Sequence, residues 1–132
     1  MSDLGAGKSI LIVEDNEKNL KLARDVLQFH GFRTVETARG EDAVVLARQH
    51  LPDLVLMDIS LPGIDGVEAA RQLKAVPSTA LIPIVALTAS VTEIDRLRFG
   101  DAGFAGLIGK PIDVLTFPDQ VLAYCRRPAE ES

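Results

Sequence analysis

Cysteine is nearly absent from this chain, which has a single one at Cys125. No internal disulfide can form, so a reducing compartment is the simpler location. No apolar run approaches the roughly 20 residues that a membrane-spanning helix requires. The first residues, MSDLGAGKS, lack the charged and then apolar pattern of a signal peptide. Together these absences predict a cytoplasmic protein.

Positive charge is also scarce. The chain has 14 lysines and arginines against 19 acidic residues, a formal net charge of −5, and no basic cluster stands out. This balance argues against electrostatic binding of nucleic acid or of an anionic membrane surface. The two histidines, His30 and His50, have no second ligand at metal-binding spacing, so we interpret them as surface or capping residues.

Apolar residues, in contrast, are plentiful: hydrophobic types make up 47% of the 132 residues. That content and length suit one domain with a single core, which we expect to span residues 8–127. Residues 1–7 are predicted to be a flexible lead, and residues 128–132 a disordered tail. We expect nothing after residue 127 to form a DNA-binding module.

Short apolar runs alternate with segments of helical periodicity along the chain. The continuous runs at 9–13 and 54–57 predict strands buried on both faces, whereas the more polar run at 32–38 suits an edge strand. Two further strands are predicted at 82–89 and 104–109. Helices are predicted after Asn16 to about residue 30, at 40–51, 65–76 and 92–103, and from Thr116, the expected N-cap of a last helix with Pro118 in its first turn.

Such an alternation of strands and helices predicts an α/β fold. We expect a doubly wound, five-stranded parallel sheet with right-handed crossovers, flanked by five helices on its two faces. The predicted strand order is 2-1-3-4-5, as in flavodoxin-like folds. In sheets of this kind, sites form at the carboxyl ends of the strands, near the point where the strand order reverses.

Polar residues stand at the ends of four of the predicted strands. Glu14 and Asp15 follow the first strand, and Asp58 follows the third. Thr88 lies at the end of the fourth, and Lys110 follows the fifth. Each alone could be a turn, capping or solvated residue. Because the strand ends share one edge of the sheet, the five together favour a functional site.

Three converging carboxylates would repel one another and hold protons unless a cation neutralised them. Oxygen ligands of this kind suit Mg²⁺, which keeps several of its waters and leaves room for a phosphoryl oxygen. We predict that Asp15, assisted through water by Glu14, holds the metal together with Asp58. The backbone carbonyl of Ser60 could complete the ligand set.

A carboxylate can also act as a nucleophile and form an acyl phosphate. Asp58 is our candidate for this role because it stands alone at the end of the central strand. Mg²⁺ and Lys110 would balance the incoming phosphoryl charge, and the Thr88 hydroxyl could donate a hydrogen bond to it. The pattern therefore predicts a phosphate acceptor site.

These motifs resemble those of a known family. LIVEDN, LVLMDISLPGIDG, ALTA and GKP fall in the order and spacing of response-regulator receiver domains, the CheY-like superfamily, over residues 8 to about 126. The chain looks most like single-domain DivK-type regulators and the receivers of hybrid kinases. The resemblance implies that Asp58 is the phosphorylated aspartate and that Glu14 and Asp15 hold Mg²⁺. It makes Thr88 the switch hydroxyl and Lys110 the lysine that pairs with the phosphoryl group.

The resemblance also implies partners and a role in two-component signalling. The phosphoryl donor would be a phosphohistidine on a sensor histidine kinase or a histidine phosphotransfer protein, and the output would be contact with a downstream protein or phosphorelay. The chain would be a monomer that catalyses only its own phosphorylation and dephosphorylation. The bond before Pro111 would be cis. One departure is Leu107, where the family often has tyrosine or phenylalanine.

Other functions stay open beside this phosphorylation switch. An aspartyl-phosphate phosphatase commonly has a second aspartate two residues after the nucleophile, a position that Ser60 occupies here. A receiver-fold module that binds proteins independently of phosphorylation stays open because of Leu107. A flavodoxin-like cofactor binder would need a phosphate-cradling loop after the first strand, and the sequence has none.

The first predicted helix carries a second apolar stripe, formed by Leu22, Val26 and Phe29. It lies about 100° around the helix from the predicted core face. The stripe could be a docking surface for a kinase or phosphotransfer helix, or it could pack against the last helix. We expect Leu22 to be its most exposed member.

Overall fold

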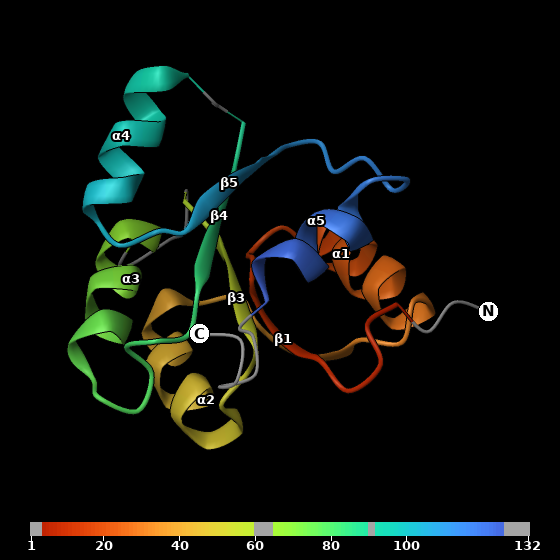
Figure 1. Cartoon of the computed structure of the whole chain (residues 1–132), viewed down its shortest axis with the longest axis horizontal. Coiled ribbons are helices and arrows are strands. Elements are labelled where there is room, and N and C mark those ends of the chain that lie inside the picture. Colours follow the sequence, from red (N-terminus) through yellow and green to blue (C-terminus); the bar gives the residue numbers. More distant parts are fainter. Residues whose placement is uncertain (1–3, 60–64, 90–91, 126–132) are drawn as a thin grey trace.

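A five-stranded parallel sheet forms the centre of the protein in a computed structural model that describes residues 4–59, 65–89 and 92–125. The strand order is β2-β1-β3-β4-β5, with every neighbouring pair parallel, so the predicted α/β fold and strand order are confirmed. β3 is the central strand (Figure 1), and β2 and β5 are the edges of the sheet. The strands are β1 (Ser9–Val13), β2 (Arg33–Thr37), β3 (Leu54–Asp58), β4 (Ile84–Thr88) and β5 (Gly106–Gly109).

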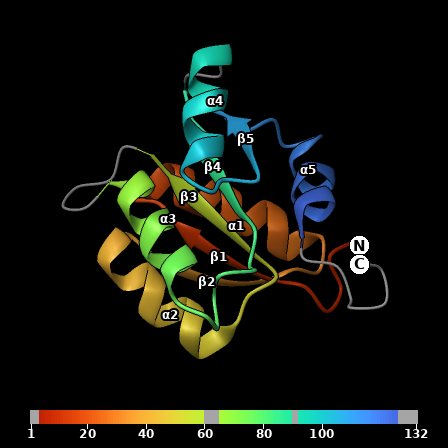
Figure 2. The ribbon, with the colours of Figure 1, turned by 60° about the vertical axis from the view of Figure 1, so that its left-hand side comes forward.

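Helices cover both faces of this sheet (Figure 2). They are α1 (Glu17–Phe29), α2 (Ala43–His50), α3 (Gly66–Ala75), α4 (Glu93–Asp101) and α5 (Phe117–Tyr124), with a short 3₁₀ turn, η1 (Gly40–Asp42), before α2. α1 and α5 lie on one face, and α2, α3 and α4 lie on the other. No helix in the described part of the chain is long and apolar enough to cross a membrane.

Alternation along the buried strands divides the core in two. Neighbouring residues Leu11 and Ile12 of β1 point to opposite faces: Leu11 packs with residues of α2, α3 and α4, and Ile12 with residues of α1 and α5. Strands buried on both faces must be apolar at every position, which is why their sequences run without polar interruption. The first polar residues after these runs therefore mark the edge of the core.

The ends of α1 follow the predicted capping chemistry. The Asn16 side chain accepts a hydrogen bond from the Asn19 backbone N–H at 3.0 Å, which satisfies one free donor of the first turn. Gly31, with a φ of 91°, takes the left-handed conformation that ends the helix at little steric cost. His30 is the residue that follows the last turn, as its interpretation as a capping residue predicts.

The prediction of one helix over 40–51 is wrong at both ends. Gly40–Asp42 form the 3₁₀ turn η1, and regular α-helix starts only at Ala43. At the other end Leu51 is left-handed, with a φ of 45°, because the chain must turn before Pro52.

The start of α5 also differs in detail from the prediction. Thr116 does precede the helix and Pro118 lies in its first turn, but the Thr116 side chain makes no capping hydrogen bond. The Asp113 carbonyl instead accepts hydrogen bonds from the backbone N–H groups of Thr116 and Phe117. Cys125 directly follows α5 and is buried.

The described part of the N-terminal lead is a packed turn. The Gly5 backbone N–H donates to the His30 carbonyl at 2.8 Å, and Lys8 N–H donates back to the Gly5 carbonyl at 2.9 Å. A Cβ at Gly5 would lie only 2.2 Å from a ring carbon of Phe32, so only glycine fits there. The flexibility of residues 1–7 and of the tail, 128–132, stays a prediction.

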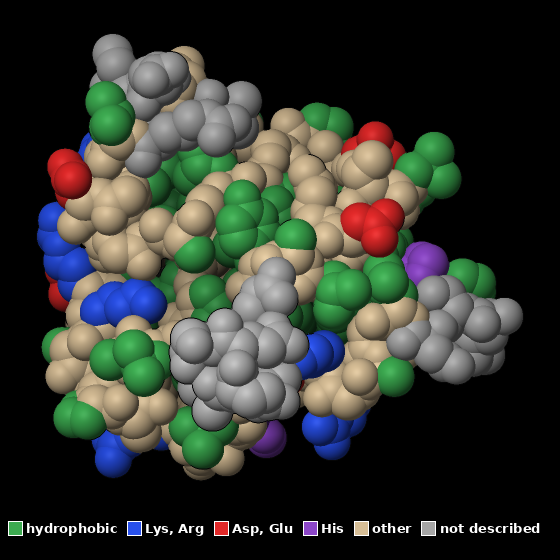
Figure 3. Space-filling view, viewed as in Figure 1, with side chains coloured by type: hydrophobic (Ala, Val, Ile, Leu, Met, Phe, Trp, Pro, Cys, Tyr) green, Lys and Arg blue, Asp and Glu red, His purple; other side chains and the backbone are tan. Residues whose placement is uncertain are grey.

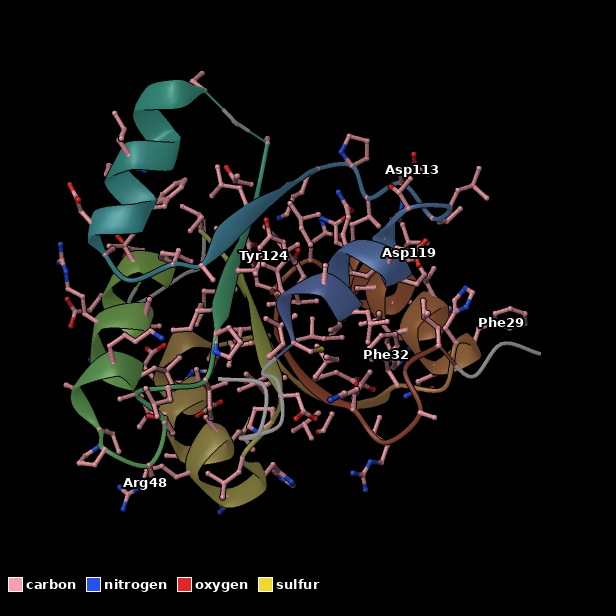
Figure 4. All side chains as sticks on the ribbon, viewed as in Figure 1. Phe29, Phe32, Arg48, Asp113, Asp119 and Tyr124 are labelled. Atoms are coloured by element: carbon pink, nitrogen blue, oxygen red, sulfur yellow. The ribbon has the colours of Figure 1, made fainter. Side chains whose placement is uncertain are left out.

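The apolar stripe of α1 was interpreted either as a docking surface or as a packing surface, and its residues differ in this respect. Val26 packs with the core cluster beneath α1 and α5. Phe29 is 60% exposed and Leu22 37%, so the expectation that Leu22 would be the most exposed member is wrong. Phe29 is more exposed because it lies in the last turn of α1, where its side chain points away from the protein (Figure 4).

Candidate functional site

The strand register brings the predicted site residues to one level at the carboxyl edge of the sheet. Val13 pairs with Met57, so the residues that follow them, Glu14 and Asp58, stand side by side. Asp58 pairs with Leu87, and Thr88, one residue further along, ends β4. Residue Ser60, our candidate carbonyl ligand, lies outside the described residues. Its role stays a prediction.

Three carboxylates converge at this edge. Glu14 is 1% exposed and Asp58 3% exposed, whereas Asp15 faces solvent. One carboxylate oxygen from each residue lies within 4.8 Å of the other two. Glu14 and Asp58 are buried where their strands meet the edge of the core, and Asp15 follows one residue later at the surface. Convergence from β1 and β3 is the arrangement that the strand-end rule predicts.

Lys110 supplies the positive charge of the site. Its ammonium nitrogen lies 3.0 Å from Asp58 Oδ1 and 3.0 Å from Glu14 Oε1. The lysine is carried over the site by the chain after β5: its backbone N–H donates to the Thr88 carbonyl at 2.8 Å, and the following bond to Pro111 is cis, as the resemblance implies. One lysine therefore contacts both buried acids.

The two oxygens of Glu14 have different surroundings. Oε2 accepts a hydrogen bond from the Asn16 backbone N–H at 3.2 Å. Within the described part of the chain, Oε1 is buried and accepts no hydrogen bond of good geometry, although the Lys110 ammonium lies near it as an ion pair. Burial, and next the neighbouring Asp58 carboxylate, raise the pKa of Glu14 to about 7. Lys110 and the Asn16 N–H oppose this rise only in part.

Lys110 itself stays charged. Partial burial alone would lower the pKa of Lys110, because it disfavours the charged ammonium. The contacts with Asp58 and Glu14 outweigh burial, so that the pKa of Lys110 is raised above its ordinary value. A permanent cation therefore stands beside Asp58.

The donor set fits a hard divalent cation. Three carboxylates at short range, one of them with a buried oxygen that lacks a hydrogen bond, form an oxygen-rich pocket with excess negative charge. Mg²⁺ prefers oxygen ligands and binds through one or two carboxylates while it keeps several waters. A bound cation would oppose the rise in the pKa of Glu14, because nearby positive charge favours the ionised carboxylate. Glu14, Asp15 and Asp58 are the described residues that could hold it.

Two features of the site were not predictable from residue types. Asn16 appeared in the sequence only as a helix cap, and a hydrogen bond from its backbone leaves no signal in a sequence. The second feature is a hollow of about 200 Å³ beside Leu107, between α4 and β5, where hydrophobic side chains gather (Figure 3). Its lining is formed by Leu107 with Phe99, Gly100, Phe104, Ala105 and Gly106.

Comparison with known proteins yields one family. Residues 10–121 match the response regulator receiver domain. The polar-differentiation response regulator DivK of Brucella anthropi is 43% identical over 117 residues, which cover 89% of this chain and 95% of that protein. The DivK of Brucella ovis is equally similar, at 43% identity over 117 residues.

Solved structures give the same result for the fold. The receiver domain of the sensor histidine kinase PA1611 from Pseudomonas aeruginosa, described with a magnesium ion coordinated in its active site cleft, superposes with a TM-score of 0.82 at 34% identity. That match covers 90% of this chain and 98% of the other. The chemotaxis regulator CheY4 of Vibrio cholerae, at 20% identity and a TM-score of 0.84, shares the fold over 89% of this chain and 98% of its own.

Proposed function

This chain belongs to the response regulator receiver domain family, and on that premise we propose that it accepts a phosphoryl group on Asp58 in a Mg²⁺-dependent reaction. The donor is a phosphohistidine on a sensor histidine kinase or a histidine phosphotransfer protein. Phosphorylation then changes the contacts that the domain makes with a downstream protein, or the phosphoryl group passes onward in a relay.

The main support for the proposal is the arrangement of charged groups around Asp58. The Lys110 ammonium lies 3.0 Å from Asp58 Oδ1, and the carboxylates of Glu14 and Asp15 lie beside the same Asp58. A phosphoryl group needs positive charge on its oxygens and a nucleophile at its phosphorus. A nucleophilic carboxylate with a fixed cation and a set of metal ligands around it meets both needs.

The transfer exchanges one bond for another. A carboxylate oxygen of Asp58 attacks phosphorus, the new O–P bond forms as the P–N bond to the imidazole breaks, and the donor histidine leaves with the electron pair of that bond. Lys110 balances charge on one phosphoryl oxygen throughout. Mg²⁺, when bound by Glu14, Asp15 and Asp58, supplies further charge neutralisation and orients the phosphoryl group.

Thr88 has a second role in the proposal. It ends β4, it is 8% exposed, and its carbonyl accepts the hydrogen bond that holds the Lys110 backbone. After transfer we assign its hydroxyl as a hydrogen-bond donor to the new phosphoryl group. A shift of Thr88 would be transmitted to β5 through Lys110. Leu107, partly buried against the core on the side of α2, α3 and α4, would respond to it in place of an aromatic ring.

We assign the docking surface for the phosphohistidine protein to α1. Leu22 and Phe29 form an exposed apolar pair on this helix, which begins beside the acidic residues of the site. The single buried thiol of Cys125 agrees with a cytoplasmic location for this exchange.

The test is a mass measurement on the intact protein. Incubation with Mg²⁺ and acetyl phosphate should add one phosphate to the wild-type chain and none to Asp58→Asn. Asp119→Asn is the matched control, because Asp119 is an exposed acid in the first turn of α5, and it should be modified like the wild type. An unmodified wild-type chain, or an adduct that survives in Asp58→Asn, would overturn the proposal.

A further inference from the structure

The turn between β1 and α1 holds the Glu14 side chain through the backbone. Asn16 makes two hydrogen bonds in this turn: its side-chain oxygen accepts from the Asn19 N–H at 3.0 Å, and its own N–H donates to Glu14 Oε2 at 3.2 Å. The first bond fixes Asn16 at the start of α1, in an extended conformation with φ −83° and ψ 116°. The second bond fixes one oxygen of a buried carboxylate.

The main chain before the turn is anchored independently. The Glu14 backbone N–H donates to the Thr37 carbonyl of β2 at 3.0 Å, which continues the β1–β2 ladder. A change at Asn16 would therefore leave the start of the turn in place. What it would alter is the direction of the Asn16 N–H and, with it, the rotation of the Glu14 carboxylate.

The other oxygen of Glu14, Oε1, faces the charged groups of the site. Oε1 is buried without a hydrogen bond in the described part of the chain and lies 3.0 Å from the Lys110 ammonium. The Glu14 carboxylate as a whole belongs to the cluster with Asp15 and Asp58. A buried carboxylate oxygen that lacks a hydrogen bond is costly unless a charge or ligand uses it. The turn thus holds Oε2 by a hydrogen bond, whereas Oε1 is compensated by positive charge alone, that of the Lys110 ammonium.

We propose that Asn16 is a positioning residue for the metal: by capping α1 it directs its own N–H at Glu14 Oε2 and so fixes the rotation of the carboxylate that, with Asp15 and Asp58, would hold the cation. This inference deepens the proposed function, on which it rests. Residues that orient metal ligands from behind typically change metal affinity by about 10- to 100-fold when they are removed. Because Asp15 and Asp58 stay in place, we expect the lower end, about tenfold.

The experiment compares four variants by calorimetric titration with Mg²⁺ or Mn²⁺ alone, in the absence of any phosphoryl donor. Asn16→Ala removes the cap, and Asn16→Gly removes the same oxygen at a smaller cost to the helix, which keeps the test valid if the alanine variant folds poorly. Asn16→Ser restores a capping oxygen. Thr79→Val is the matched control: the buried Thr79 hydroxyl donates to the Leu73 carbonyl at the far end of α3, away from the site.

The expected result is a metal dissociation constant raised about tenfold in Asn16→Ala and in Asn16→Gly, and close to wild type in Asn16→Ser. Thr79→Val should melt at a lower temperature with an unchanged metal dissociation constant. Wild-type metal affinity in both Asn16→Ala and Asn16→Gly would overturn the inference, as would an equal loss in Thr79→Val or no rescue by serine.

Phosphorylation separates this inference from the function on which it rests. At saturating Mg²⁺, Asn16→Ala should still gain one phosphate on Asp58, since saturation compensates for weaker binding. If the wild-type chain gains no phosphate, the proposed function fails, whatever the metal titrations give. If the wild type gains phosphate and the Asn16 variants bind metal normally, only the positioning role fails.

Discussion

Glu14 is a buried acid whose pKa is set by burial and by the charges of Asp58 and Lys110. Burial and the adjacent Asp58 raise the pKa of Glu14 from 4.5 to about 7, despite Lys110. The folded protein therefore binds more protons at this group than the unfolded chain does between these pH values. Stability contributed at Glu14 therefore falls as the pH rises through that window.

The metal-free protein should therefore become less stable as the pH rises from about 5 to 8. Glu14→Gln cannot ionise, so in this variant that component of the fall should vanish, and at pH 8 the variant should melt above the wild type. Thermal unfolding in the presence of EDTA, at several pH values, measures the difference between the two curves. Parallel curves would show that Glu14 does not titrate in this window.

Mg²⁺ should reverse the order of the two melting temperatures at pH 8, so that the wild type melts above Glu14→Gln. A bound cation stabilises the folded wild type by mass action and favours ionised Glu14, whereas Glu14→Gln offers a weaker ligand. The rise in melting temperature on addition of Mg²⁺ should thus be larger for the wild type than for Glu14→Gln, and larger at pH 8 than at pH 5. An equal rise in the melting temperature of both proteins would show that Glu14 does not contribute to metal binding.

At the scale of elements, α3 supports the tip of β3 by close packing. A Cβ at Gly66, the first residue of α3, would lie 2.4 Å from the Asp58 carbonyl oxygen and 3.0 Å from Ile59 Cα. Both contacts are with backbone, which cannot move without shifting Asp58. The position of the acceptor therefore depends on the absence of a side chain at the start of the next helix.

Gly66→Ala should lower stability by roughly 1 to 3 kcal/mol, as overpacking does, and should slow phosphorylation by acetyl phosphate. Gly100→Ala is the matched control, since Gly100 is an exposed residue of α4 with no atom within 4 Å of its Cβ position. It should gain up to about 1 kcal/mol from helix propensity. Urea unfolding and the rate of adduct formation check both, and a neutral Gly66→Ala would contradict the packing argument.

The exposed pair on α1 gives a prediction about the donor. Leu22→Asp and Phe29→Asp should slow transfer from a phosphorylated histidine phosphotransfer protein that modifies the wild type, by about tenfold or more, because apolar anchors dominate such interfaces. The rate with acetyl phosphate should not change, since that donor needs no docking surface. Both rates are followed by the mass of the intact protein.

Val45→Asp is the control for this prediction. Val45 is 55% exposed on α2, which lies on the other face of the sheet. A charge there should leave both rates unchanged. Equal slowing by Val45→Asp, or equal slowing with acetyl phosphate, would contradict a docking role for α1.

Local patterns predicted most of these elements and failed where alternatives compete. Apolar runs gave every strand to within two residues, because strands buried on both faces admit few polar residues. The start of α2 was misplaced because a 3₁₀ turn, Gly40–Asp42, precedes it; such turns are frequent at the ends of α-helices, and the helical pattern did not separate the two. At Thr116 the residue type suited an N-cap, but Pro118 removes one of the two backbone N–H groups that a capping side chain binds, and no capping hydrogen bond forms.

At the scale of the whole molecule, the site exists because four strands end at one edge. Parallel pairing alone brings Glu14 beside Asp58, although 44 positions separate them in the chain, and that convergence followed from the order of strands and polar residues. The direction of each carboxylate oxygen did not follow. It depends on a backbone donor at Asn16 and on the chain path after β5, which residue types do not encode.

The central claim is that a single carboxylate, Asp58, receives the phosphoryl group. The most direct measurement treats the protein with Mg²⁺ and acetyl phosphate, reduces the acyl phosphate with borohydride, and maps the peptides by mass spectrometry. Reduction turns a phosphorylated aspartate into homoserine and leaves free carboxylates intact. We predict homoserine at position 58 and nowhere else. Homoserine at position 15, the corresponding alcohol of glutamate at position 14, or no reduced residue at all would contradict the account.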